Sequence, residues 1–185
     1  MTGGIELLKR VYEIQIRWTA FPLHPDTPEE GLTLEALFAG RNIDIPQMKS
    51  RLKTAAKNFG VDIGDRQETY NSRLAQELGK WAESKSKGDE FHLAAFKAYF
   101  INGQNIAKIP ILVDIAKSVN LSEKEAQTVL EKRSFSQAVS SDWRRAVEME
   151  IRAVPTFLFN GQSLPGAQKY ETLDRLMVTH NVARR

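Results

Sequence analysis

The sequence contains few residues of the types that carry out chemistry. Its 185 residues include no cysteine, so they supply no redox thiol, no disulfide and no thiolate ligand for zinc. His24, His92 and His180 are far apart, and none stands in the spacing of a metal site such as His-Glu-x-x-His. The sequence also has no glycine-rich phosphate loop and no Gly-x-Ser-x-Gly motif. We therefore expect no catalytic residue, no metal site and no cofactor in this chain.

The C-terminal part of the chain has the pattern of a β-hairpin followed by a helix. The segment 156–164 has the pattern of a strand, an Asn160-Gly161 turn and a second strand, which predicts strands over 156–159 and 162–164 joined by a two-residue turn. The spacing of apolar residues after the hairpin predicts a helix over 167–178.

A further strand is predicted near the N-terminal end. The segment from Glu13 to Trp18 alternates polar and apolar side chains, which is the period of a half-buried strand. Three prolines within residues 22–28 then end this strand and hold the chain extended. Residues 6–12, before the strand, have the pattern of the end of a helix.

Mostly helical residues separate these two ends. Apolar residues at spacings of three and four predict helices over 33–39, 46–59, 69–84, 91–102, 109–118 and 134–151. Ser122 and Glu125 form a capping box that begins a further helix. Because neither end has enough strand to be stable alone, we expect both ends to share one sheet. The pattern as a whole indicates an α/β chain interrupted by a helical insertion.

The bulk composition excludes several classes of partner. The net charge is +3, from 26 basic and 23 acidic side chains, which gives no large basic field, and we expect no nucleic-acid binding. No window approaches the roughly 20 apolar residues that a membrane-spanning helix requires. The charged N-terminal residues do not resemble a secretory signal. We expect a cytoplasmic protein that does not associate with membranes.

Five segments carry recognisable motifs. They read Trp18-Thr19-Ala20-Phe21-Pro22-Leu23-His24-Pro25, Asn71-Ser72-Arg73-Leu74-Ala75, Phe96-Lys97-Ala98-Tyr99-Phe100 with Gly103 and Asn105-Ile106, Ala153-Val154-Pro155-Thr156-Phe157, and Pro165-Gly166-Ala167-Gln168. Together and in this order, they resemble the FrnE-type branch of the DsbA family, whose members are thioredoxin-like proteins. The Val-Pro-Thr motif alone is a weak signal, but five segments in register extend over nearly the whole chain.

This resemblance implies an α/β, thioredoxin-like fold with a large helical insertion. The thioredoxin-like part would comprise residues 1–29 and 150–185, and the insertion residues 30–149. Family members begin with a strand and a Cys-x-x-Cys motif at the start of the first helix. Neither has a counterpart here, so we expect the first β-strand to be absent from this chain. A coding start placed too late, a trimmed chain and a genuine truncated paralogue would each account for the difference.

The resemblance also implies a substrate-binding site at Val154, Pro155 and Thr156. In the superfamily this proline is cis, which leaves the backbone of the preceding residue free to pair with an extended peptide. The alternative is an ordinary trans proline at the start of a strand. Asn71 and Arg73 belong to another family motif. They either orient a groove or, in the case of Asn71, cap a helix or lie on the surface.

Three functions remain open. The first is a DsbA-type thiol-disulfide oxidoreductase that is redox-inactive as given, because exchange requires a thiolate. The second is a peptide-binding or chaperone-like module whose partner is an extended or unfolded polypeptide. The third is a relative of the glutathione-dependent kappa-class transferases and 2-hydroxychromene-2-carboxylate isomerases, with glutathione bound near Val154. A sheet without its first strand would also leave an unpaired edge, which makes a homodimer a candidate assembly.

Overall fold

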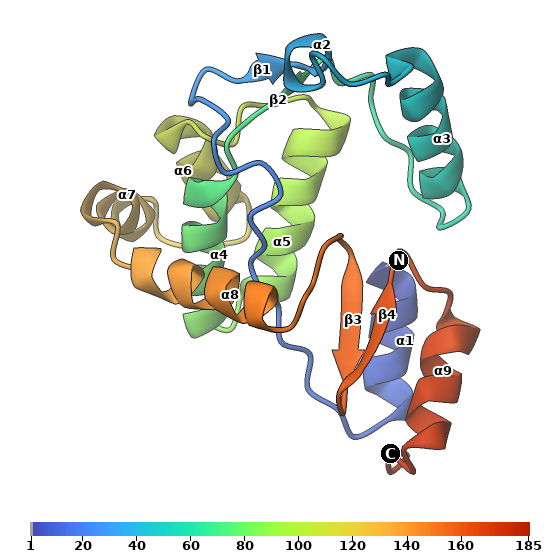
Figure 1. Ribbon diagram of the computed structural model, residues 1–185. Helices are drawn as coiled ribbons and strands as arrows, with labels where there is room; N and C mark the ends of the chain where they lie inside the picture. The colour runs from blue at the N-terminus through green and yellow to red at the C-terminus, as the bar shows by residue number, and fades with distance from the viewer. Residues whose placement is uncertain (1) are drawn as a thin grey trace. The chain divides into compact units, whose positions relative to one another are not determined.

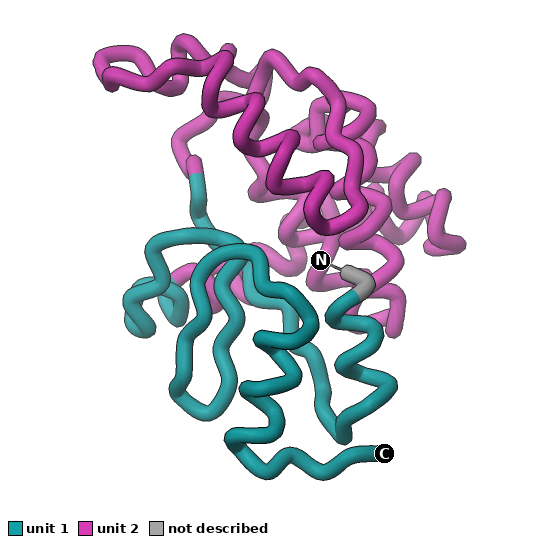
Figure 2. Tube along the Cα trace, turned by 90° about the vertical axis from the view of Figure 1, so that its right-hand side faces the viewer, with its two compact units in different colours: residues 1–23, 144–185 teal, residues 24–143 magenta. Residues whose placement is uncertain are grey.

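The computed structural model describes residues 2–185, and the side chains of residues 4–185. The chain forms two compact units (Figure 2). Unit 1 comprises the residues up to Leu23 together with Arg144–Arg185, and unit 2 comprises His24–Trp143. Compactness does not show that a unit folds independently, so the domain boundaries after residues 29 and 149 stay a prediction.

Unit 2 is built from helices around one apolar core. Most of the core comes from α4 (Arg73–Ser84), α5 (Gly88–Phe96), α6 (Ile109–Ser118) and α7 (Glu123–Lys132). Its buried members are Ala75, Leu78, Trp81, Ala82, Phe91, Ala98, Ile106, Leu112, Ile115, Ala116, Ala126 and Leu130. Full burial of a large apolar side chain contributes about 1.5–3 kcal/mol, so this cluster is the main source of stability in unit 2.

Local sequence signals set several helix boundaries in unit 2. α6 begins and ends at the predicted residues, with Pro110 in its first turn. The Ser122 hydroxyl accepts a hydrogen bond from the amide of Glu125 (3.3 Å), which confirms the predicted start of α7. In α3 (Ile45–Lys57) the carboxylate of Asp44 accepts a bond from the Gln47 amide (2.9 Å) in the same way.

Unit 2 also contains a short ladder that the sequence did not predict. β1 (Leu32–Thr33) pairs antiparallel with β2 (Glu68–Thr69), and α2 (Leu34–Leu37) follows β1 directly. The helix predicted from residue 69 therefore begins later, at Arg73. The reason is the pairing of Thr69 with Leu32, a contact between distant parts of the chain that helical periodicity cannot indicate.

The helix predicted over 91–102 changes its winding. α5 ends at Phe96, and a π-helical turn, η1 (Lys97–Ile101), continues from it. The rings of Phe96 and Phe100 lie 4.7 Å apart across this turn. Wider turns of this kind have no marker in apolar spacing, so the sequence indicated one regular helix.

Unit 1 combines helices with a β-hairpin (Figure 1). α8 (Ser136–Glu148) leads from unit 2 into unit 1, where the hairpin of β3 (Thr156–Phe159) and β4 (Gln162–Pro165) follows. The hairpin packs on α1 (Thr2–Val11) and α9 (Tyr170–Thr179). The buried residues of this core are Leu8, Tyr12, Leu173, Leu176 and Met177, with Phe157, Phe159 and Leu164 of the hairpin packed against them.

The hairpin confirms the prediction from its turn residues. Asn160 and Gly161 have φ values of 44° and 79°. Positive φ at both central residues defines a type I′ turn, for which Asn-Gly is the preferred pair.

The predicted strand over Glu13–Trp18 is wrong. Exposure alternates along this segment, as expected, but its residues belong to no ladder in the described chain. Alternation indicates a half-buried extended segment, whereas a strand also needs a partner, and β3 pairs with β4 alone within residues 2–185. The expectation that both ends share one sheet is therefore also wrong.

The start of this segment is attached to the C-terminal residues instead. The Glu13 amide donates to the carbonyl of Ala183 (2.9 Å), and Tyr12 forms an isolated bridge with Arg184. The amide of Arg185 donates to the carbonyl of Val11, at the end of α1 (3.0 Å). Within the described chain, no helix has the length and apolar character needed to cross a membrane.

Candidate functional site

The predicted binding residues Val154, Pro155 and Thr156 lie together between the end of α8 and the hairpin. After α8 the chain turns at Glu150, whose φ is 54°. The Val154–Pro155 peptide bond is cis. The three residues form one continuous stretch of backbone that leads into β3.

Two hydrogen bonds fix this loop to the hairpin. The Thr156 hydroxyl donates to the carbonyl of Ala153 (2.7 Å), which closes the turn around Val154-Pro155. The Gly166 amide donates to the carbonyl of Pro155 (2.7 Å). The Val154 side chain remains 45% exposed. The loop thus has a fixed backbone and an accessible apolar side chain.

The register of the hairpin defines its hydrogen-bonded pairs. Phe159 pairs with Gln162 beside the turn, and Phe157 pairs with Leu164. In a hairpin with a two-residue turn, these are the pairs that exchange N–H···O bonds. The side chains of Phe157 and Phe159 also pack on the core of unit 1.

β3 consequently has a free backbone edge. Thr156 and Leu158 alternate with the bonded residues, so their amide and carbonyl groups point away from β4. No strand within residues 2–185 pairs with that side of β3. An edge of this kind is a ready template for pairing with another extended chain.

The two outer edges of the hairpin differ in sequence. β3 carries no charged side chain and no proline, the residue types that obstruct edge pairing. On β4 the residue opposite Thr156 is Pro165, which has no amide to donate. Leu158 is also 40% exposed. Edge pairing is therefore more favourable on β3 than on β4.

Asn71 makes structural contacts within unit 2. Its side-chain amide donates to the carbonyls of Pro25 and Thr27 (3.0 and 2.8 Å), and its Oδ1 accepts a bond from the Arg73 amide (2.9 Å). Asn71 therefore attaches the proline-rich loop to the start of α4. The N-cap of α4 is Ser72, so Asn71 serves as an anchor for this loop and is not the capping residue.

Arg73 belongs to a charge cluster around Glu77. Arg73 Nε donates to Glu77 Oε1 (2.8 Å), and Arg133 donates to both carboxylate oxygens (2.8 and 2.7 Å). Burial alone would raise the pKa of the Glu77 carboxyl, but the bonds and charges of Arg133 and Arg73 hold it below its ordinary value. The Glu77 side chain is fully buried, so this cluster stabilises unit 2 and is not open to a ligand.

The remaining chemistry-bearing side chains do not converge. No group of three or more histidine, aspartate or glutamate residues in the described part of the chain is arranged to hold a metal ion. His92 contacts Glu83 in unit 2 (3.3 Å), and His180 contacts Gln162 in unit 1 (3.3 Å). These contacts are local to helix and hairpin surfaces.

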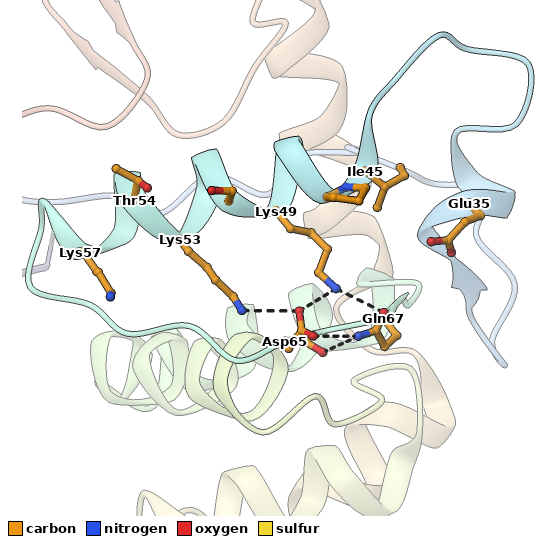
Figure 3. Close-up of a pocket in the computed structure, with 10 residues that line it drawn as sticks. Glu35, Ile45, Lys49, Lys53, Thr54, Lys57, Asp65 and Gln67 are labelled. Carbon is orange, nitrogen blue, oxygen red and sulfur yellow. Dashed lines mark hydrogen bonds and ion pairs between the residues drawn. The ribbon is translucent and has the colours of Figure 1, made fainter.

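The structure also contains a polar pocket that the sequence did not predict (Figure 3). It lies between α3 and residues 65–67 and has a volume of about 590 Å³. Lys49, Lys53 and Lys57 extend toward it from α3, and Asp65 faces Lys49 and Lys53. The spacing of the lysines is a sequence signal, but it is equally typical of a solvated helix face.

Comparison with other sequences gives relatives at low identity. YwbO of Bacillus subtilis strain 168 is 26% identical over 170 residues, which cover 88% of this chain and 80% of YwbO. The ClpXP adapter protein SpxH of the same strain is 24% identical over 102 residues, which cover 51% of this chain and 34% of SpxH.

The fold has a close counterpart among solved structures. The probable DsbA oxidoreductase SCO1869 of Streptomyces coelicolor superposes with a TM-score of 0.78 at 19% identity, over 87% of this chain and 73% of that one. This likeness confirms the thioredoxin-like α/β fold with a helical insertion. The family described as DSBA-like thioredoxin domain matches residues 4–178. The chain therefore belongs to the family of DsbA-like thioredoxin-domain proteins.

Proposed function

We propose that this chain is a FrnE-type, cytoplasmic member of the DsbA family that binds extended or unfolded polypeptides without thiol chemistry of its own. The bound segment pairs with the free edge of β3, next to Val154-Pro155. The outward direction of the Thr156 and Leu158 backbone groups carries this proposal. The FrnE-type assignment rests on the motifs within residues 18–25, 71–75 and 96–106.

Strand addition suits a protein that binds many sequences. Main-chain bonds to Thr156 and Leu158 do not depend on the side chains of the bound segment. Each such bond contributes a net of about 0.5–1.5 kcal/mol, which favours moderate and reversible affinity. The exposed side chains of Val154 and Leu158 add apolar contact beside the edge.

Two proline substitutions in the hairpin test this proposal. Leu158→Pro removes the outward amide of β3 and keeps the bonded residues Phe157 and Phe159. Ser163→Pro makes the same change directly opposite, on the outer edge of β4. Binding of fluorescein-labelled lactalbumin, kept unfolded by reduction and carboxymethylation, is measured by fluorescence anisotropy. Far-UV circular dichroism establishes that both variants fold.

We expect Leu158→Pro to weaken binding by up to roughly tenfold, because the lost main-chain bond removes up to about 1.4 kcal/mol. Ser163→Pro should leave binding within about twofold, because the edge of β4 takes no part. If Leu158→Pro unfolds, Leu158→Lys against Ser163→Lys gives the same comparison with a charge on each edge. Equal effects at the two edges, or no binding by the unsubstituted chain, would contradict the proposal.

An adapter role in protein degradation is a second candidate, and the similarity to SpxH supports it. Surface plasmon resonance with purified ClpX and immobilised chain tests it directly. Saturable binding that Leu158→Pro does not change would favour the adapter role over polypeptide capture at β3. No binding to ClpX would remove this candidate.

A further inference from the structure

Three lysine side chains of α3 line the same pocket. Lys49, Lys53 and Lys57 succeed one another at intervals of four residues, and Figure 3 shows all three directed toward the pocket. Side chains four residues apart on a helix lie about 5–6 Å from each other at Cβ, so adjacent amines can contact one ligand. The volume of about 590 Å³ is within the range of small-molecule sites.

The three lysines are engaged to different degrees. Lys49 Nζ lies 2.6 Å from Asp65 Oδ1 and donates to Gln67 Oε1 (3.3 Å). Lys53 Nζ lies 3.6 Å from the same carboxylate oxygen, beyond hydrogen-bond length. Among the contacts of the described residues, none engages the amine of Lys57. Lys53 is therefore held only by a long ion pair, and Lys57 is the amine nearest to it that a ligand can engage.

Asp65 orders one end of the pocket and limits its positive charge. The hydrogen bond from Lys49, with the charges of Lys49 and Lys53, lowers the pKa of Asp65, so this carboxylate is ionised at neutral pH. Asp65 and Glu35 together offset two of the three lysine charges that line the pocket. The uncompensated charge lies toward Lys57, one turn beyond the ion pair.

We propose that this pocket binds a small anion with two adjacent phosphate groups, bridged between Lys53 and Lys57. Two linked anionic groups match two amines one helical turn apart better than a single compact anion does. α3 contains no fully buried residue, so its attachment to unit 2 is weak. A ligand in the pocket adds contacts to this helix and holds it in place.

Isothermal titration calorimetry with inorganic pyrophosphate, on the full chain at low ionic strength, tests the site. We expect saturable binding that Lys53→Gln and Lys57→Gln each weaken roughly fivefold. Asp65→Asn should strengthen binding by a similar factor, because it removes a competing negative charge and releases Lys53. Lys124→Gln on α7 removes one positive charge from unit 2 outside the pocket, and it should leave binding within about twofold.

Hydrogen exchange gives a second measurement. Pyrophosphate should protect the amides of α3 and leave those of α7 unchanged. Absence of saturable binding, weaker binding by Asp65→Asn, or an effect of Lys124→Gln equal to that of Lys53→Gln would overturn the proposal. Because the pocket lies in unit 2 and the hairpin in unit 1, failure here leaves polypeptide binding at β3 untouched.

Discussion

Two carboxylates of unit 2 illustrate how burial sets the role of a residue. Glu77 is fully buried and bonded to Arg73 and Arg133, whereas the Asp65 side chain is 59% exposed between lysines. Removing one member of a buried pair leaves an uncompensated charge, while an exposed pair contributes little. Glu77 is therefore a structural residue, and Asp65 remains accessible at the edge of a pocket.

Glu77→Ala should lower the free energy of unfolding by at least about 2 kcal/mol. The expected loss of stability is smaller than for a fully buried ion pair, because the Arg133 side chain is 49% exposed. Urea unfolding followed by circular dichroism measures the change. Glu123→Ala is the control, since its exposed pair with Lys117 (3.1 Å) contributes less than about 1 kcal/mol. A loss no larger than that of the control would show that the cluster around Glu77 is not stabilising.

The same carboxylate gives a prediction for acid stability. Its pKa is lower in the folded chain than its ordinary value, so the unfolded state binds the proton more tightly. The stabilisation is therefore complete above about pH 5 and is lost as the pH falls through the folded-state pKa. Unfolding free energies measured from about pH 5 to pH 3 should fall less steeply in Glu77→Gln than in the unsubstituted chain. Parallel pH profiles would contradict this assignment.

At the scale of elements, signals confined to a few neighbouring residues predicted structure well. The Asn160-Gly161 turn, the cap at Ser122 and the bounds of α6 were all correct, because their causes are local. The strand at Glu13–Trp18 failed and β2 was missed, because a strand depends on a partner elsewhere in the chain.

The sequence predicted the site at residues 154–156 but not the pocket beside α3. Val154, Pro155 and Thr156 came from a resemblance between motifs, since a proline before a strand is uninformative alone. The pocket beside α3 had no equivalent signal. Its lysines resemble a solvated helix face until the fold brings Asp65 opposite them.

Two glycine-to-alanine substitutions compare a residue of the hairpin turn with a residue of a helix. Gly161→Ala should destabilise the chain by about 1–2 kcal/mol, because φ is 79° and nothing lies within 4 Å of the added Cβ. Gly4→Ala in α1 should stabilise by up to about 1 kcal/mol, since its Cβ meets Tyr170 at an ordinary 3.8 Å. Thermal unfolding of both variants should shift in opposite directions. Shifts of the same sign would contradict the assigned turn.

At the scale of the whole molecule, this chain keeps the DsbA-like fold but has no residue for thiol chemistry. Residues 4–178 match a DsbA-like domain, yet the 185 residues contain no thiol. The edge pairing that we propose at β3 requires only backbone groups, so it would not depend on a thiol.

Because the chain has no cysteine, we expect it to be inactive in thiol-disulfide exchange assays. Purified protein should neither reduce insulin nor oxidise a dithiol peptide above the buffer rate, because no residue forms the mixed disulfide that exchange requires. A turbidity assay with dithiothreitol measures the first activity, and loss of free thiol measures the second. A rate that increases with protein concentration and survives removal of small-molecule thiols would overturn this prediction.

The C-terminal residues complete the first helix, which has a practical consequence. The Arg185 amide donates to the carbonyl of Val11 (3.0 Å), a group that a helix end otherwise leaves to water. Arg185 Nε donates to the carbonyl of Tyr12 (3.1 Å), which also accepts the Ile14 amide (3.0 Å). Loosening of residues 183–185 would therefore expose the end of α1, at the opposite end of the described sequence.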